Sequence, residues 1–273
     1  MSTFSVPTLA DMIAQGQTPE VLFWVGCAGS FDDRAKRITK AIARILHHCE
    51  VPFAVLGAEE SCTGDPAKRA GNEFLFQMQA AQNIAVLNGY EVKRIVTGCP
   101  HCFNVLKNEY PELGGNYEVM HHTQFIRDLI DQGRLRVADG NPFKGRRITF
   151  HDPCYLGRGN GEYAAPREVL STLDAELVEM RRCKQNGLCC GAGGAQMFKE
   201  AEKGNREVNH ERTDDVLDAN PQVLATGCPF CNTMMTDGVK NAERESSIDV
   251  KDIAELIAEA ADLVPSSNSQ DKP

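Results

Sequence analysis

Several features that define well-known classes of protein are missing from this sequence. No apolar run approaches the ~18 residues that span a bilayer, so we expect no membrane span. The N-terminus has neither the basic start nor the apolar stretch of a signal peptide. Basic charge is not in excess either, because 29 Lys and Arg residues face 38 Asp and Glu residues, for a net charge of −9. This balance argues against nucleic acid or an anionic membrane as the main partner and indicates a cytoplasmic protein.

Cysteine is present, but not at the density of a disulfide scaffold. The chain has 11 cysteines in 273 residues, an odd number, and a protein of this length buries an adequate core without covalent staples. The length also fits two compact domains. We therefore expect reduced thiols, and reduced cysteines in such number indicate a metal site.

The cysteine positions indicate an internal duplication. Four cysteines of the first half recur in the second half at a nearly constant offset. The pairs are Cys27 with Cys154 and Cys62 with Cys189, 127 residues apart, and Cys99 with Cys228 and Cys102 with Cys231, 129 residues apart. The six residues 97–102 also match residues 226–231 at five places. The sequence therefore predicts one domain present in two copies.

Short apolar runs that alternate with helical patterns predict the fold class. The expected strands are residues 21–25, 53–56, 94–97, 117–120, 147–150, 176–179, 222–226 and 248–250. Each is followed by a cysteine loop or a helix, as in a parallel sheet whose functional groups lie at the carboxyl ends of the strands. We predict an α/β protein of two homologous parallel-sheet halves related by a pseudo-two-fold axis.

A polar connection at 133–144 separates the two halves, with turn residues at 139–142. The predicted division is an N-terminal arm at 1–18, helical from Thr8, a first domain at 19–138, a second domain at 145–264 and a disordered tail at 265–273.

Five cysteines of the second half form the most informative group. They are Cys154, Cys189, Cys190, Cys228 and Cys231. The Cys-x-x-Cys turn at 228–231 suits either Zn²⁺ or iron. The adjacent side chains of Cys189 and Cys190 diverge, so they rarely close on one tetrahedral ion, whereas a cluster of several irons offers separated sites. Five thiolates also bring roughly −5 charge into one pocket, which a multi-metal cluster neutralises.

Two other chemistries fit the same cysteines. A structural zinc site in each half needs only four thiolates and no electron transfer. A vicinal disulfide between Cys189 and Cys190 would make a redox switch. We expect Cys49 and Cys183 to be small core residues, and His101, inside the 99–102 turn, to be a loop residue near the metal.

Residues near these cysteines are weaker candidates. Gly191 follows the adjacent pair and, with the next glycines, lets backbone N–H groups approach sulfide. His122, ranked above His121, ends the fourth expected strand and is a candidate donor to sulfide, the alternative being a cap for the helix that follows. Arg158 is a candidate for offsetting cluster charge, the alternative being an ordinary ion pair.

The run Cys154 … Cys189-Cys190-Gly191 … Cys228-Pro229-x-Cys231 resembles the cysteine-rich CCG domain. That domain occurs, usually in tandem, in the B subunit of heterodisulfide reductase and in iron–sulfur subunits of glycolate oxidase, lactate-utilisation and glycerol-3-phosphate dehydrogenase systems. It also occurs in quinone reductases that accept electrons from electron-transfer flavoprotein. The resemblance extends over residues 21–261.

The resemblance implies a ligand set for each half. All five second-half cysteines would bind one [4Fe-4S]-type cluster, of the non-cubane kind found in heterodisulfide reductase. The first half departs from the pattern because Thr63 stands where a cysteine is expected. Four thiolates remain there, enough for a second, ordinary [4Fe-4S] cluster, and a scaffold without a cluster is the alternative. These four are Cys27, Cys62, Cys99 and Cys102.

The resemblance also implies an activity and partners. We expect an iron–sulfur oxidoreductase subunit that passes electrons within a heterodisulfide-reductase-like or flavoprotein–quinone reductase complex. The implied partners are a ferredoxin-like iron–sulfur subunit, a membrane subunit and a flavoprotein electron donor. They would hold this cytoplasmic chain at the periphery of the inner membrane. The alternatives are reduction of a thiol–disulfide pair, oxidation of a 2-hydroxy acid, and a zinc-stabilised interaction scaffold without redox activity.

Overall fold

Two four-stranded parallel sheets form the framework of the computed structural model, which describes residues 5–200 and 203–264. The first sheet has the order β2-β1-β3-β4, and the second has the equivalent order β6-β5-β7-β8. The first contains β1 (Val21–Trp24), β2 (Phe53–Ala54), β3 (Arg94–Thr97) and β4 (Glu118–His121). The second contains β5 (Arg147–Phe150), β6 (Glu176–Leu177), β7 (Val223–Thr226) and β8 (Asp249–Asp252). The predicted α/β fold with two duplicated halves is confirmed.

Each strand is followed by one or two α-helices in both halves, and the first half also has one helix before β1 and a second helix after β2. Those of the first half are α1 (Leu9–Ala14), α2 (Gly26–Phe31), α3 (Asp33–His48), α4 (Asp65–Arg69), α5 (Glu73–Gly89), α6 (Pro100–Asn104) and α7 (His122–Asp131). Those of the second half are α8 (Gly157–Asn160), α9 (Ala164–Ser171), α10 (Val208–Ala219), α11 (Pro229–Asn241) and α12 (Ile253–Ala260).

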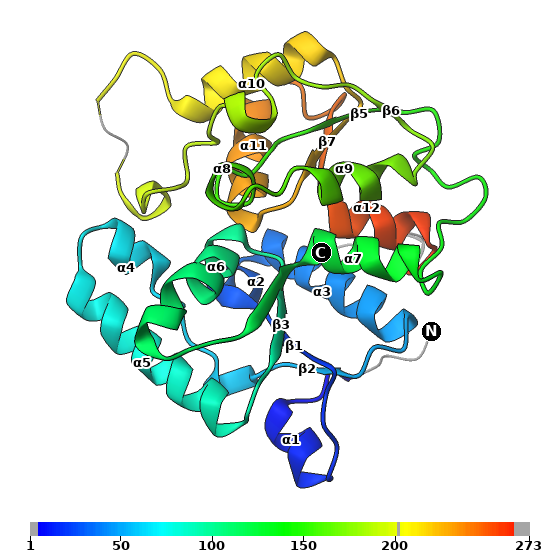
Figure 1. The fold of residues 1–273 in the computed structure, drawn as a ribbon. Helices are drawn as coiled ribbons and strands as arrows, with labels where there is room; N and C mark the ends of the chain where they lie inside the picture. Colours follow the sequence, from blue (N-terminus) through cyan, green and yellow to red (C-terminus); the bar gives the residue numbers. More distant parts are fainter. Residues whose placement is uncertain (1–4, 201–202, 265–273) are drawn as a thin grey trace, which may run out of the picture.

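Helices α3, α7, α9 and α12 lie between the two halves (Figure 1). Helix α3 begins where the Asp32 carboxylate accepts a hydrogen bond from the Ala35 N–H at 2.7 Å. Its apolar stripe then packs in one core with residues of the other three helices, among them Phe125, Val169 and Ile257. A single apolar layer therefore belongs to both halves.

The outer faces of the sheets are covered separately. Phe76 and Leu87 of α5 pack on the first sheet, and Val216 of α10 and Met235 of α11 pack on the second. Because both faces of each sheet are covered, every residue of the central strands β1 and β7 is buried, and all of them except Thr226 are apolar, as is typical of parallel strands.

The carboxyl ends of the strands meet where the halves face each other. His121 at the end of β4 donates from Nε2 to the Gly227 carbonyl at 3.0 Å, in the loop after β7. The His122 Nε2 lies 3.0 Å from Asp252 Oδ1 at the end of β8. The loops that carry the cysteines therefore converge on the mid-line between the sheets.

The predicted N-terminal arm contains α1, whose start is capped by Thr8 accepting from the Asp11 N–H at 3.1 Å. A parallel bridge between Thr8 and Val55 places this segment beside the edge of the first sheet.

The predicted tail at 265–273 lies outside the described residues. The domain boundaries at 19–138 and 145–264 stay a prediction. Among the described residues, no helix is both long and apolar enough to cross a membrane.

Candidate metal centre

The first-half cysteines come from three loops at the carboxyl edge of the first sheet. Cys27 lies in α2 directly after β1, and Cys62 lies in the loop that follows β2. Cys99 and Cys102 flank the start of α6 after β3. The Cys27 thiol donates to Cys62, which raises the pKa of Cys27 and lowers the pKa of Cys62 to about 7. The structure therefore brings four thiols of distant sequence positions into one group, the first-half cysteine set.

The five second-half cysteines form an equivalent group, the second-half cysteine set. The Cys154 thiol lies within hydrogen-bond reach of Cys189, and its donation lowers the pKa of Cys189. The Sγ atoms of Cys190 and Cys231 are 3.4 Å apart. Gly191, at φ +95°, donates its N–H to the Cys189 sulfur at 3.3 Å. The backbone can make this turn because glycine tolerates a positive φ.

The two cysteine sets approach each other across the mid-line. Cys99 and Cys228 are both buried and close enough for each thiol to shift the pKa of the other. Donation from Cys102 and Cys228 lowers the pKa of Cys99, whereas burial raises the pKa of Cys228. Neighbouring thiols therefore cannot all ionise unless bound cations neutralise them, which is the condition that a metal cluster provides.

Thr63 occupies the position in the first half that Cys190 occupies in the second. The Thr63 Oγ1 lies 3.9 Å from Cys102 Sγ, and the matching Cys190 Sγ lies 3.4 Å from Cys231 Sγ. The Thr63 side chain is buried, at 2% exposure. A hydroxyl that faces the Cys-x-x-Cys turn therefore replaces one thiol, and the pocket that surrounded the thiol is retained.

Several buried side-chain nitrogens have no hydrogen-bond partner among the described residues. They are Trp24 Nε1, His151 Nε2, Arg212 Nη2 and both ring nitrogens of His122, which lies beside Asp252. An unpaired buried donor costs about 1–3 kcal/mol, so native proteins rarely retain one. The sulfides of an iron–sulfur cluster accept hydrogen bonds, and so do metal-bound thiolates. The His151 donor, beside Cys190 and Cys231, therefore suits a metal–sulfur centre.

His151 is a residue that the sequence reasoning overlooked. One of its ring nitrogens and the sulfurs of Cys190 and Cys231 all lie within 4.8 Å of one another. Burial, together with the charge of Arg212, lowers the pKa of His151 to about 3, so the ring is neutral. A signal was available in the repeat itself, since His151 and Trp24 each stand three residues before the first cysteine of their set.

A second overlooked feature is the pair of Asp65 and His101. His101 was expected to be a loop residue, but its ring is buried and its Nδ1 lies 2.9 Å from Asp65 Oδ2. The ring also packs against Tyr155 of the second half, with centroids 4.5 Å apart, and meets Phe230 edge-on at 5.4 Å. His101 therefore joins the two halves beside the cysteines.

Glu60 fastens the Cys62 loop to the end of β1. Its carboxylate accepts hydrogen bonds from the N–H groups of Val25 at 3.0 Å and Gly26 at 2.6 Å. Burial raises the pKa of Glu60 to about 7. These bonds hold the Cys27 and Cys62 loops in one arrangement.

Of the weaker candidates, Gly191 donates to Cys189, whereas His122 and Arg158 lie near the cysteines and bond to other groups. The His122 ring is fully buried against Asp252, and its Nδ1 lies near Gly98, beside Cys99. Helix α7 begins at His122, and His121 is its N-cap, so the histidine positions also suit the structural alternative. Arg158 donates to the Gly187 carbonyl, two residues before Cys189. It therefore supports the loop that carries the adjacent cysteines.

Cys49 and Cys183 lie apart from both sets. Cys49 ends helix α3 and is buried in the apolar layer between the halves. Cys183 is half-buried, and burial together with Glu179 and Asp152 raises its pKa. Cys49 is thus the core residue that was expected, whereas Cys183 is not, because it lies half-buried at the start of a short turn.

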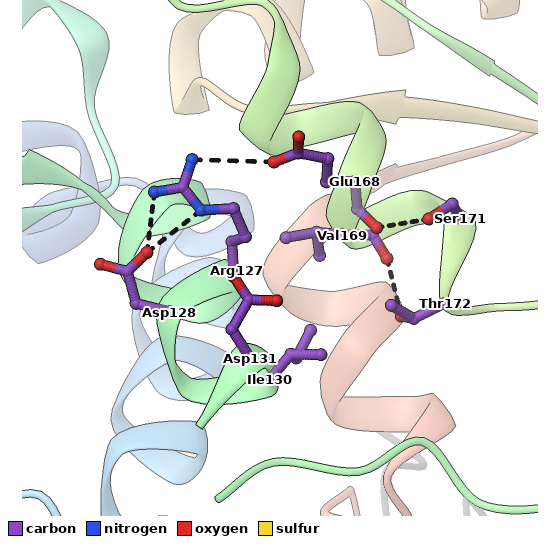
Figure 2. Close-up of a pocket in the computed structure, with 8 residues that line it drawn as sticks. All are labelled: Arg127, Asp128, Ile130, Asp131, Glu168, Val169, Ser171 and Thr172. Atoms are coloured by element: carbon purple, nitrogen blue, oxygen red, sulfur yellow. Dashed lines mark hydrogen bonds and ion pairs between the residues drawn. The ribbon is translucent and has the colours of Figure 1, made fainter. Parts of the chain in front are cut away.

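A hollow of about 590 Å³ between α7 and α9 has no cysteine in its lining (Figure 2). Three of its charged side chains pair with each other, with Arg127 2.7 Å from Asp128 and 3.7 Å from Glu168. The Ser171 and Thr172 hydroxyls donate to the backbone carbonyls of Glu168 and Val169. The hollow therefore lacks the grouped thiols and histidines that mark the cysteine sets.

Comparison with known proteins matches the cysteine-rich domain model CCG twice, at residues 21–107 and 148–236. The predicted resemblance is confirmed. The chain is 46% identical over 256 residues, 93% of its length, to the "Probable iron-sulfur-binding oxidoreductase FadF" of Bacillus subtilis, and covers 36% of that protein. It is 45% identical over 251 residues, 90% of its length, to the "EtfAB:quinone oxidoreductase" of Syntrophomonas wolfei, covering 35% of it.

A more distant relative is the D subunit of the dihydromethanophenazine:CoB–CoM heterodisulfide reductase of Methanosarcina barkeri. The identity is 34% over 251 residues, which is 89% of this chain and 59% of the relative. The chain thus spans little more than a third of the length of its two bacterial relatives above.

Proposed function

The chain belongs to the cysteine-rich CCG domain family, and from this membership we propose that it is the iron–sulfur electron-transfer part of an oxidoreductase. The observation that carries the proposal is the convergence of two cysteine sets, with the His151 donor beside Cys190 and Cys231. A [4Fe-4S]-type cluster would supply reversible electron transfer when bound. The protein would hold the thiolates, direct N–H groups at sulfur and exclude water.

The proposed ligands differ between the halves. The five second-half thiols would hold a cluster of the non-cubane kind. The four first-half thiols would hold an ordinary [4Fe-4S] cluster. Gly191 would contribute an N–H near the second-half cluster, and His122 and Arg158 would support the loops around it, as their positions favour.

The proposed setting is a larger electron-transfer assembly, in line with the oxidoreductases of which this chain matches a part. By analogy with EtfAB:quinone oxidoreductase, the electron donor would be a flavoprotein. A ferredoxin-like iron–sulfur unit and a membrane unit would continue the path, in line with a relative from Chromohalobacter salexigens named "Probable membrane-anchored ferredoxin". The chain would then work on the cytoplasmic side, at the periphery of the inner membrane.

Anaerobic purification followed by metal and sulfide analysis tests the proposal. We expect about four to eight irons per chain, with a similar amount of acid-labile sulfide. Zinc without sulfide would contradict the proposal and favour the interaction scaffold. Purification of the native complex, followed by identification of its subunits, tests the flavoprotein and ferredoxin-like partners separately.

A second candidate function is reduction of a thiol–disulfide pair. A hollow of about 320 Å³ opens beside Cys27 and is lined mainly by apolar groups, including Phe31, Phe198 and Phe230. It leaves room for an organic group next to the first-half cysteine set. Turnover of a disulfide by the reduced protein alone would favour this candidate, and turnover of a 2-hydroxy acid would favour the other alternative within the oxidoreductases.

Replacing Thr63 with cysteine tests whether the missing thiolate alone distinguishes the halves. Because Thr63 already faces Cys102, the new thiol is expected to ligate iron and to change the EPR spectrum of the first-half cluster toward that of the second half. Thr63→Ser keeps a hydroxyl at this position and is expected to leave the spectrum unchanged. An unaltered spectrum in the iron-loaded Thr63→Cys protein would show that the surrounding pocket, not residue 63, sets the cluster type.

A further inference from the structure

Each half ends its first strand with a buried ring N–H that has no acceptor among the described residues. Trp24 ends β1, and His151 follows β5 directly, with its backbone N–H bonded to the Ala225 carbonyl of β7 at 3.0 Å. Both side chains are fully buried, and neither Trp24 Nε1 nor His151 Nε2 finds a partner in the described part of the chain. The internal repeat has therefore kept a ring donor at equivalent places, although the residue type differs.

The hydrogen bonds of His151 determine where its proton lies. Arg212 donates from Nε to His151 Nδ1 at 3.1 Å. An arginine side chain has no acceptor atom, so Nδ1 must present its lone pair to it. In a neutral imidazole the proton then resides on Nε2. Nε2 is consequently a donor and has no lone pair with which to bind iron.

The position of Arg212 is itself well determined. Its Nη1 donates to Asp215 Oδ2 at 2.9 Å and to the Arg182 carbonyl at 2.6 Å, and the side chain is fully buried. Arg212 therefore cannot turn away and release Nδ1 without breaking two further bonds. If His151 were a sixth cluster ligand, its Nε2 would need a lone pair and its Nδ1 would carry the proton. The hydrogen bond that Arg212 donates to Nδ1 disfavours this tautomer.

The acceptor for His151 is indicated by its neighbours. The nearby sulfurs of Cys190 and Cys231 are proposed ligands of the second-half cluster. The histidine thus lies at the edge of the place where cluster sulfur would be bound. A buried site of this kind strengthens a hydrogen bond to sulfur because little water competes for it.

We propose that His151 donates a hydrogen bond from Nε2 to sulfur of the second-half cluster, and that Trp24 is its counterpart in the first half. The inference rests on the proposed function. Such a bond stabilises the more negative, reduced state, so it raises the reduction potential. His151 is accordingly a positioning and tuning residue, and the ligands remain the five cysteines.

Pulsed EPR of protein in which only the histidines carry ¹⁵N tests this arrangement without altering the structure. We expect a weak ¹⁵N coupling to the paramagnetic cluster that disappears in the His151→Gln protein, whose glutamine nitrogens are unlabelled. His210→Gln, at a half-buried position of α10 where the ring pairs with Asn241, is the matched control and is expected to keep the coupling. A strong coupling lost in His151→Gln would identify His151 as a ligand and overturn the proposal, as would a coupling that this substitution leaves unchanged.

The reduction potential provides the second readout. His151→Phe removes the donor, and we expect the equilibrium constant for reduction to fall about tenfold, which corresponds to ~59 mV for one electron. His151→Gln retains an N–H, so a smaller fall is expected in that variant. Trp24→Phe keeps the proposal testable if the His151 variants do not load iron, and it is expected to lower the potential of the first-half cluster.

Different results would contradict the proposed function and the hydrogen-bond assignment. Wild-type protein without iron and sulfide would overturn the proposed function. Iron-loaded protein whose potentials are unchanged in His151→Phe and Trp24→Phe would overturn only the hydrogen-bond assignment.

Discussion

Replacement of Cys231 by serine is expected to remove the second-half cluster, with a loss of about four irons per chain and of the corresponding EPR signal. The position of Cys231 explains this expected loss. Cys231 is buried, lies 3.4 Å from Cys190 and shares a tight turn with Cys228, so no other side chain can take its place. Iron and sulfide analysis of anaerobically purified protein measures the loss.

Cys183→Ser is the matched control for this prediction. It removes a thiol of the same half that lies apart from the set, so iron content and spectrum are expected to match those of the wild type. Iron content that falls in Cys183→Ser but not in Cys231→Ser would contradict the ligand assignment. If Cys62→Ser alters the non-cubane signal and Cys190→Ser does not, the two cluster types belong to the opposite halves.

Asp215→Asn is expected to lower the free energy of unfolding by about 3–5 kcal/mol, the usual cost of breaking a buried ion pair. The Asp215 carboxylate is fully buried and accepts from Arg182 at 2.7 Å, Arg212 at 2.9 Å and Arg181 at 3.1 Å. Without it, the guanidinium of Arg212 stays buried beside His151 with its charge uncompensated. Urea unfolding of iron-loaded protein, followed by circular dichroism, measures the change.

Asp214→Asn is the control, because Asp214 is the neighbouring residue on α10 and pairs with Arg206 on the surface. Salt screens such an exposed pair, so stability is expected to stay nearly unchanged. An equal loss in both variants would mean that burial of the Asp215 pair is irrelevant to stability.

The contribution of Asp215 also has a defined pH dependence. Burial alone would raise the pKa of this carboxyl, but hydrogen bonds from Arg182, Arg181 and Arg212 outweigh burial and hold the pKa below its usual value. The stabilisation is therefore complete above the unfolded pKa of about 3.9 and is lost as the pH falls through the lower pKa of the folded state. The difference between wild type and Asp215→Asn is expected to shrink only in that acidic range.

Most strands were predictable because their signal is local. The apolar runs at 94–97 and 147–150 became β3 and β5 with the same bounds. The edge strands β2 and β6 are shorter than expected, at two residues each, whereas the opposite edge strands β4 and β8 have four residues each. Patterning identifies such a segment but cannot say how far its pairing extends.

The candidate site was predictable only as a set of residue types. Spacing identified the cysteines, and the repeat exposed Thr63 as the departure. The approach of Cys99 to Cys228 and the burial of His101 between the halves depend on how the halves dock. That docking is made by α3, α7, α9 and α12, whose shared core no single segment of sequence reveals.

Residue order alone establishes the duplication, the number of thiols in each half and the loss of one thiol at Thr63, because these are properties of a covalent chain. The folded arrangement was needed to show that the two cysteine sets approach each other at the mid-line and that His151 Nδ1 accepts a hydrogen bond, which leaves the ring proton on Nε2. Both findings depend on a neighbour distant in sequence, since Cys228 lies near Cys99, and Arg212 donates to a ring 61 positions earlier.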